Sequence, residues 1–383
     1  MNGYYNPVKI YQEPGCAARV GEVLEELGTG KRALLLAWNP MVFQQPAFAG
    51  LLQPSFSWEV RTCCFQMTNP TMEQLFEVYQ ETKEFAPDVV IAVGGGSTLD
   101  IGKSLCCLYG KEIPNVAALR VMIQSKEYGR PGARWIGIPT TAGTGSETTC
   151  WATIWDPSKD AKRSVESRDN FAYAALVDPE MSKSMPLGLA VNSALDAAAH
   201  AVESYWAKGT NSVSRALALC AVRTIMKAMD GLLAGRPEAH NDMAKGSMLA
   251  GLAFSSTRTT ACHSISYPLT MRCGIPHGAA VSLLLAPVLR LNLGSFSGQE
   301  ELLEALGAAD ADELEEKIGN YLRQASLPSS LQEWGVKREE LRRLAQFGVT
   351  KGRADNNPVE INAENILHIL EQAYSARPIR KGA

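Results

Sequence analysis

The chain carries the stretch Asp88-Val-Val-Ile-Ala-Val-Gly-Gly-Gly-Ser-Thr-Leu-Asp-Ile-Gly-Lys103, in which a short apolar run meets three consecutive glycines. The β-branched run predicts a buried strand, and a helix is expected to open at Ser97. Glycines let the backbone approach a phosphate closely, and a helix N-terminus offers free N–H groups. The spacing differs from the Gly-x-Gly-x-x-Gly fingerprint, so this turn alone is weak evidence for a nucleotide site.

A second polar, glycine-rich turn strengthens that interpretation. It is Ile138-Pro-Thr-Thr-Ala-Gly-Thr-Gly-Ser-Glu147, and it follows the apolar run Trp135-Ile-Gly-Ile138. Its hydroxyl side chains can bond a phosphate or a ribose. Together with the runs at 32–37, 89–93 and 174–177, these segments alternate with helix-like stretches, which favours a parallel sheet with helices on both faces.

The residue composition and the hydrophobic pattern change near residue 185, between Pro179 and Pro186. Beyond it, Ala, Leu, Glu and Met dominate, and residues 188–235 and 298–347 predict helices separated by short turns. We therefore expect an α/β dinucleotide-binding domain at residues 1–183 and an α-helical, metal-binding domain at residues 184–383.

Four residues of the second half predict the metal site: Asp196, His200, His263 and His277. Asp196 and His200 are four apart in an Ala-rich run, which puts both side chains on one helical face. Three of the five histidines in the chain fall in these segments. One carboxylate and three imidazoles suit Fe(II), Zn(II) or another divalent metal, with positions left open for substrate. The alternative for each histidine alone is a core residue with a satisfied hydrogen bond.

The composition is that of a globular protein. Its 383 residues suit two domains, and 46% are hydrophobic and 20% charged. A net charge of −3 gives no reason to expect nucleic acid or an anionic membrane as partner. We expect no bilayer span and no secretory signal, and nine cysteines without a Cys-x-x-Cys motif indicate reduced thiols in a cytoplasmic protein.

Five motifs, taken in order, resemble the iron-containing (group III) alcohol dehydrogenases: the two glycine-rich turns, Asp178-Pro179, the Asp196/His200 segment and the His263/His277 segment. Asn357-Pro358 fits the same pattern, and the resemblance spans nearly the whole chain. It implies the fold shared with dehydroquinate synthase, in which an α/β nucleotide domain and an all-α metal domain flank a cleft, and it implies a homodimer.

The resemblance also implies the chemistry of an oxidoreductase that acts on CH–OH donors. A divalent metal polarises the substrate oxygen, and hydride passes between the substrate carbon and NAD(H) or NADP(H). By position, Gly95, Gly96 and Ser97 match the pyrophosphate contacts and Lys162 matches a ribose contact. The nucleotide site would also be lined by Asp100, Thr140, Thr141, Thr144, Ser146 and Thr149. Asp100 and Lys103 could instead be charges on a helix surface.

Two positions depart from the family pattern. Many relatives have a second histidine four residues after the third ligand, where this chain has Tyr267. Tyr267 could donate a hydrogen bond near the substrate, or it could be a packing aromatic. Many relatives also place an Asp after the strand at 32–37 to hold the ribose 2′-OH of NAD. This chain has Trp38-Asn39 there, so both cofactors stay open, with NADH slightly favoured.

Segments at 150–157, 162–168 and 263–270 resemble the branch that reduces phosphonoacetaldehyde, to which sulfoacetaldehyde reductases are related. An anionic head group needs cationic donors. The candidates are Arg168, Arg258, Arg272 and Arg353, each of which could also be a surface or inter-domain arginine, and Trp151 could wall the pocket.

Other functions stay open. The chain could be a general short-chain primary alcohol dehydrogenase. Dehydroquinate synthase, a lyase, and glycerol dehydrogenase share the glycine motif and the fold, but the turn at 140–147 fits the iron-type alcohol dehydrogenases better. A metal-stabilised, non-enzymatic binding protein is the third alternative, and a metal quartet combined with a cofactor turn argues against it.

Overall fold

The computed structural model describes residues 3–28, 30–159, 161–349 and 352–375, which form two compact units. The α/β unit comprises Asn6–Thr141 and Gly145–Lys183. The helical unit begins at Ser184 and also includes residues 3–5 and Ala142–Thr144. The chain therefore leaves the α/β unit twice, after Thr141 and after Lys183, which a single boundary near residue 184 does not capture. The cofactor and metal roles expected of the two domains stay predictions.

A six-stranded parallel sheet, in the order β1-β8-β5-β4-β2-β3, forms the centre of the α/β unit, which also contains the antiparallel hairpin β6-β7. Its elements are β1 (Lys9–Tyr11), α1 (Val20–Leu27), β2 (Arg32–Ala37), α2 (Pro46–Ala49), β3 (Glu59–Cys64), α3 (Met72–Thr82), β4 (Val89–Gly94), α4 (Gly96–Leu108), α5 (Val116–Ser125), β5 (Arg134–Pro139), β6 (Trp151–Asp156), β7 (Ala161–Glu166) and β8 (Ala174–Leu176). The predicted strands agree with β2, β4, β5 and β8 to within a residue at each end.

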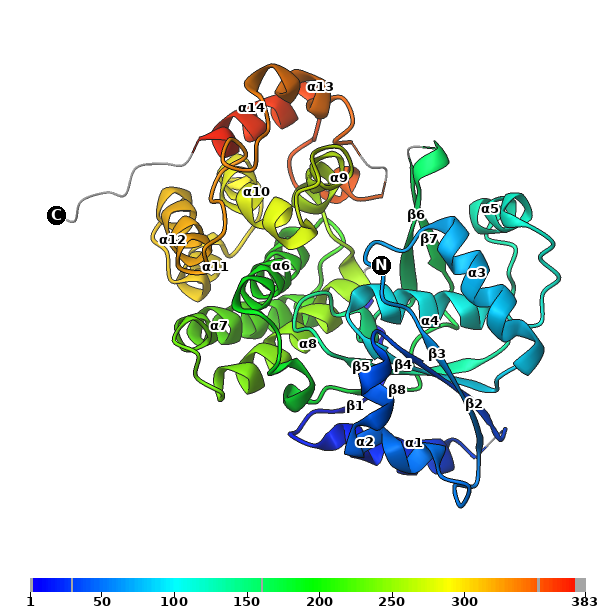
Figure 1. Ribbon diagram of the computed structural model, residues 1–383. Coiled ribbons are helices and arrows are strands. Elements are labelled where there is room, and N and C mark those ends of the chain that lie inside the picture. The colour runs from blue at the N-terminus through cyan, green and yellow to red at the C-terminus, as the bar shows by residue number, and fades with distance from the viewer. Residues whose placement is uncertain (1–2, 29, 160, 350–351, 376–383) are drawn as a thin grey trace. The chain divides into compact units, whose positions relative to one another are not determined.

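Helices cover both faces of this sheet, as predicted (Figure 1). Successive strand residues point to opposite faces. In β2, Leu34 and Leu36 join the core formed with α3, α4 and α5, whereas Ala33 and Leu35 join the core formed with α1. Strands that are buried on both faces have continuous apolar sequences, which is why these strands could be recognised from the sequence.

The carboxyl ends of β2, β4 and β5 lie side by side. Trp38 N donates a hydrogen bond to Val93 O at 3.0 Å, and Thr140 N donates to Gly94 O at 3.0 Å. The turns after these three strands therefore share one edge of the sheet, which is where open α/β sheets bind ligands.

The helical unit contains no strand among its described residues. Its helices are α6 (Leu187–Trp206), α7 (Ser212–Leu233), α8 (Ala239–Thr257), α9 (Ala261–Cys273), α10 (His277–Asn292), α11 (Gln299–Leu306), α12 (Ala311–Gln324), α13 (Leu341–Ala345) and α14 (Ala363–Tyr374). The prediction of helix for residues 298–347 is wrong over 325–337, which hold none. Proline at 328 disfavours a helical conformation at Leu327, and Gly335 has a positive φ of 83°.

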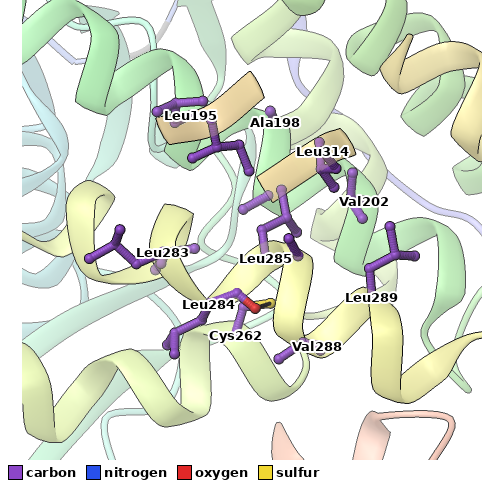
Figure 2. Close-up of a cluster of buried hydrophobic side chains, with 14 of the residues drawn as sticks. Leu195, Ala198, Val202, Cys262, Leu283, Leu284, Leu285, Val288, Leu289 and Leu314 are labelled. Carbon is purple, nitrogen blue, oxygen red and sulfur yellow. Dashed lines mark hydrogen bonds between the residues drawn. The ribbon is translucent and has the colours of Figure 1, made fainter. Parts of the chain in front are cut away.

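Helices α6, α9, α10 and α12 share one apolar core (Figure 2). Leu195, Ala198 and Val202 of α6 pack among the leucines of α10, and Cys262 of α9 directs its thiol at the Leu284 carbonyl, 3.9 Å away. Burying one leucine side chain contributes about 1.5–3 kcal/mol. This core fixes the helices that carry the predicted metal ligands. Among the described residues, no helix combines the length and apolarity needed to span a bilayer.

Candidate functional site

Helix α6 carries Asp196 and His200 one turn apart. As the spacing predicts, the two side chains are neighbours: His200 Nδ1 lies 3.9 Å from Asp196 Oδ2. Glu203, one turn further along, lies on the same face. All three side chains are buried, with exposures of 4%, 6% and 0% for Asp196, His200 and Glu203.

The other two predicted ligands lie near helix N-termini. His263 is in the first turn of α9, and His277 is the first residue of α10. The start of α10 comes very close to α6, because a Cβ atom on Gly278 would lie 2.4 Å from Asn192 O. Only glycine permits this approach. His277 is thereby held beside Asp196.

The structure brings Asp196, His263 and His277 together: one ligand atom from each lies within 4.8 Å of the others. His263 Nε2 is 3.4 Å from Asp196 Oδ1, and the His263 and His277 ring centroids are 5.4 Å apart. His200 is not part of this group. Its ring stacks on Phe254 at 4.3 Å and lies 4.2 Å from the His263 ring.

Charges within the cluster favour an ionised carboxylate and a neutral His200. Burial raises the pKa of Asp196, but the imidazoles of His200, His263 and His277 outweigh it and hold this pKa well below its usual range. Burial and the neighbouring His263 lower the pKa of His200 to about 4. Burial also lowers the pKa of His263, but the carboxylates of Glu203 and Asp196 raise it overall.

Three buried atoms of this cluster lack a hydrogen-bond partner among the described residues: Asp196 Oδ1, His200 Nδ1 and His263 Nε2. Each such atom costs about 1–3 kcal/mol. One carboxylate oxygen and two imidazole nitrogens are also the donors that a divalent first-row metal prefers. The cluster therefore fits a metal ion, with His200 as a neighbouring donor whose place in the ligand set stays a prediction.

Tyr267 follows His263 by one turn of α9 and is half-buried. Arg258 and Arg353 also belong to the helical unit, and Arg353 acts electrostatically on His200. Arg272 is placed differently, because its guanidinium stacks on Phe347, 3.9 Å from the ring centroid. Trp151 is buried and Arg168 exposed in the α/β unit, and their part in substrate binding stays a prediction.

The glycines in the turn after β4 differ in whether the fold leaves room for a side chain. A Cβ on Gly94 would lie 2.5 Å from the Thr98 side chain, so the fold itself requires glycine there. Gly95, the N-cap of α4, has φ −72° and ψ −179°, which any residue adopts, and its Cβ would meet only Thr141 at 3.4 Å. Glycine at 95 is therefore not explained by folding, and close approach of a phosphate would explain it.

Several predicted cofactor residues also make hydrogen bonds within the protein, and their contact with a cofactor stays a prediction. Asp100 accepts from Ser146 Oγ at 2.6 Å and from Thr153 N at 2.7 Å. Lys103 Nζ reaches the Ser146 and Thr149 hydroxyls at 3.0 and 2.8 Å, and it also contacts the Ser146 and Trp151 carbonyls. Lys103 is fully buried, so the alternative of a helix-surface charge is wrong for it. Sequence reasoning missed this role of Lys103.

The remaining predicted cofactor residues are on several elements. Asn39 Oδ1 accepts from Met41 N at 2.8 Å, and Ser97 Oγ accepts from Asn69 N at 3.1 Å. Lys162, on β7, lies over the Trp155 ring at 5.6 Å. Thr140 is buried, whereas Gly96, Thr141 and Thr144 are partly exposed. Contact between these residues and a cofactor stays a prediction.

Comparison with known proteins identifies the family. A sequence profile described as "Iron-containing alcohol dehydrogenase" matches residues 7–179, and one described as "Fe-containing alcohol dehydrogenase family, C-terminal" matches residues 190–374. Together they cover nearly all of the chain.

Individual relatives agree with these profiles. Lactaldehyde reductase of Escherichia coli is 29% identical over 316 residues, or 80% of this chain and 82% of its own length. Sulfoacetaldehyde reductase of Bilophila wadsworthia is 27% identical over 347 residues, covering 87% and 88% of the two chains. The crystal structure of sulfoacetaldehyde reductase from Bifidobacterium kashiwanohense, in complex with NAD+, superposes with a TM-score of 0.85 at 26% identity and covers 98% and 99% of the two chains. The chain belongs to the iron-containing alcohol dehydrogenase family and is an oxidoreductase of that class.

Proposed function

We propose that this enzyme is a metal-dependent, NAD(P)H-linked reductase of a short-chain aldehyde with an anionic head group. Aldehyde, NAD(P)H and a proton give a primary alcohol and NAD(P)+. Phosphonoacetaldehyde, giving 2-hydroxyethylphosphonate, and sulfoacetaldehyde, giving isethionate, are the candidate substrates. The anionic head group is supported chiefly by one observation: Arg353 lies within electrostatic range of both Arg258 and His200, which adjoins the metal-site cluster.

Asn356 holds the backbone around these two arginines in place. Arg258 follows the last residue of α8, and Arg353 precedes the short helix η9 (Ala354–Asn356). Asn356 Nδ2 donates to the Thr257 and Thr259 carbonyls at 2.8 and 3.1 Å, so it grips both neighbours of Arg258. Two arginines 95 positions apart in the sequence are thereby fixed in one region.

Arg258 has a strained backbone. Its φ of 67° and ψ of 176° fall in a region that is essentially restricted to glycine. Such strain costs about 1–3 kcal/mol and persists where the side chain serves a purpose. An arginine at a position suited to glycine supports a functional role for the guanidinium.

The charges around Arg353 leave positive potential to be neutralised. Arg353 is partly buried, and its guanidinium forms no hydrogen bond or ion pair with any residue in the described ranges. Burial lowers the pKa of Arg353, and Arg258 lowers it further, while Glu203 and Tyr267 act in the opposite direction. A bound anion would favour the charged form of Arg353, and phosphonate or sulfonate oxygens match the donors of a guanidinium group.

We assign different roles in the reaction to different side chains of the helical unit. When bound, the metal supplies a Lewis acid and the nicotinamide supplies hydride. Asp196, His263 and His277, with His200, would hold the metal. Arg258 and Arg353 would bind the head group and so orient the aldehyde. The Tyr267 hydroxyl is the proposed hydrogen-bond donor to the substrate oxygen, and Tyr267→Phe should lower kcat without changing metal affinity.

The cofactor would lie on the turns after β2, β4 and β5. The helix N-terminus at Gly95 and Gly96 suits a pyrophosphate. We propose NADH as cofactor, because a structurally similar relative was solved in complex with NAD+. No carboxylate follows β2 at Trp38-Asn39 to oppose a 2′-phosphate, so we also expect measurable use of NADPH. Iron as the metal, a homodimer and a cytoplasmic location stay predictions.

The test compares kcat/KM for Fe(II)-loaded enzyme and NADH across four aldehydes. Phosphonoacetaldehyde and sulfoacetaldehyde are anionic, whereas propionaldehyde and glycolaldehyde are neutral. We expect a preference of about 100-fold for an anionic substrate, which corresponds to about 2.7 kcal/mol of differential transition-state binding. Equal rates would leave a general short-chain alcohol dehydrogenase, an alternative supported by the similarity to lactaldehyde reductase. No turnover on any of the four would remove the proposal.

A further inference from the structure

Glu203 is a fully buried carboxylate that neither the metal cluster nor the arginine pair includes. It lies on α6, three residues after His200, and its two oxygens have different partners. Oε1 accepts from Thr260 N at 3.1 Å, from Thr260 Oγ1 at 2.7 Å and from Cys262 N at 2.8 Å. Oε2 pairs with His263 Nδ1.

The first oxygen serves the N-terminus of α9. The first N–H groups of a helix have no partner inside the helix. Thr260, the N-cap of α9, makes no capping bond with its own side chain, and Glu203 takes that role from a neighbouring helix. A negative charge is also favoured at this end of the helix dipole. This interaction explains why the carboxylate can be buried without a cation.

The second oxygen determines which nitrogen of His263 carries the proton. A carboxylate only accepts hydrogen bonds, so Nδ1 must be the protonated nitrogen. In the neutral imidazole Nε2 then presents a lone pair, and this is the atom 3.4 Å from Asp196 Oδ1. A carboxylate behind the ring also makes the distal nitrogen a better donor to a metal.

We infer that Glu203 is a positioning residue: it holds the His263 imidazole in the tautomer and orientation that bind the metal through Nε2. The inference rests on the proposed metal-dependent function. Glu203 is not among the clustered ligand residues Asp196, His263 and His277, so it would act on the metal through His263.

Glu203→Gln separates this role from capping. The amide oxygen can still accept the bonds from Thr260 and Cys262, but the amide nitrogen then faces His263 Nδ1. Because that nitrogen donates, it favours the tautomer with the proton on Nε2, which blocks the ligand atom. Zn²⁺ affinity, measured on metal-free protein by chelator competition, should fall roughly 10- to 100-fold.

Thr260→Val is the matched control. It removes the hydroxyl that bonds Glu203 and that accepts from Trp206 Nε1 at 2.8 Å, but it leaves the Glu203–His263 pair intact. We expect it to lower the Tm of the metal-free protein without changing Zn²⁺ affinity. Glu203→Gln should show the reverse pattern, with a large loss of affinity and a smaller change in Tm.

Unchanged Zn²⁺ affinity in Glu203→Gln would overturn the inference and leave Glu203 a helix cap. If that variant does not fold, ¹⁵N NMR of histidine-labelled, metal-free wild-type protein decides the question. A proton on His263 Nδ1 supports the inference, and a proton on Nε2 overturns it. Failure of the proposed function is distinguishable, because wild-type protein would then bind no metal or reduce no aldehyde.

Discussion

His263 Nε2 lies 3.4 Å from Asp196 Oδ1, and neither atom has a hydrogen-bond partner among the described residues. With the proton of His263 on Nδ1, facing Glu203, both atoms are acceptors with lone pairs directed at each other. Two buried acceptors at this separation repel unless a proton on Nε2 or a metal ion lies between them. This pair is therefore the strongest local reason to expect a metal in the helical unit.

Substitution of His277 and of His263 should have different effects on the stability of the metal-free protein. His277→Ala should weaken Zn²⁺ or Fe(II) binding by at least about 100-fold, since outer partners alone are worth 10- to 100-fold, and should leave NADH affinity intact. His263→Ala should do the same and also destabilise the metal-free protein by about 3 kcal/mol, because it leaves Glu203 buried without its partner. Metal content, NADH titration and urea unfolding measure these effects. Full activity with normal metal content in His277→Ala would contradict the cluster.

The sequence carried much of this site because its key spacings are local. Asp196 and His200 share a helix, and the helical repeat alone placed them together. Glu203 was missed although it continues the same repeat, seven residues after Asp196. The sequence signal for Glu203 is an acidic residue in an otherwise apolar helix, on the same face as the two candidate ligands.

Other features depend on tertiary structure and could not be predicted. Arg258 and Arg353, far apart in the sequence, are linked by tertiary hydrogen bonds such as those of Asn356, and Arg258 has its positive φ in the turn between α8 and α9. Lys103 looks like a surface lysine in the sequence. Its neighbours in the chain do not indicate that it donates hydrogen bonds to the carbonyl oxygens of Ser146 and Trp151.

Gly95→Ser should separate cofactor binding from folding. Serine is favoured at a helix N-cap, and a Cβ at this position has room beside Thr141, so stability should be unchanged or slightly higher. The new side chain would occupy the space through which a pyrophosphate approaches. We expect NADH affinity, measured by fluorescence titration, to fall at least about 10-fold, which corresponds to 1.4 kcal/mol.

Gly94→Ala provides the contrast. Its Cβ would meet Thr98 at 2.5 Å, so this variant should lose stability first and cofactor affinity only as a consequence. If Gly95→Ser binds NADH as tightly as wild type, the assignment of this turn to the pyrophosphate is wrong.

Arg258→Gly should exchange specificity for stability. Glycine adopts the backbone conformation of residue 258 without strain, a relief of about 1–3 kcal/mol that is partly offset by about 0.5–1 kcal/mol of added chain entropy. The lost guanidinium should lower kcat/KM for the anionic aldehyde roughly 10- to 100-fold and leave neutral aldehydes unaffected.

Arg258→Ala is the control for strain, since it removes the same charge but keeps a Cβ atom in the strained conformation. Both variants should lose selectivity for the anionic aldehyde. The glycine variant should unfold at a higher urea concentration than the alanine variant. Equal loss on anionic and neutral aldehydes would show that Arg258 supports the site as a whole and does not bind a head group.

Glu147→Gln should stabilise the protein at high pH and not at low pH. Glu147 is 2% exposed, and burial raises the pKa of its carboxyl to about 7, although the nearby Lys103 opposes this rise. The folded state therefore binds a proton more tightly than the unfolded state, whose carboxyl has its ordinary value of 4.5. Stability from this group is fully present below pH 4.5 and is lost as the pH rises through 7.

A rise of this size corresponds to roughly 3 kcal/mol of stability lost by pH 8, which the neutral amide would avoid. The Tm of Glu147→Gln should therefore exceed that of wild type at pH 8, and the difference should shrink toward pH 5. The exposed Glu127 offers the matched control, because Glu127→Gln changes the same charge without a burial cost. An equal Tm difference at both pH values would mean that Glu147 is ionised in the folded protein throughout, with Lys103 as its effective counter-charge.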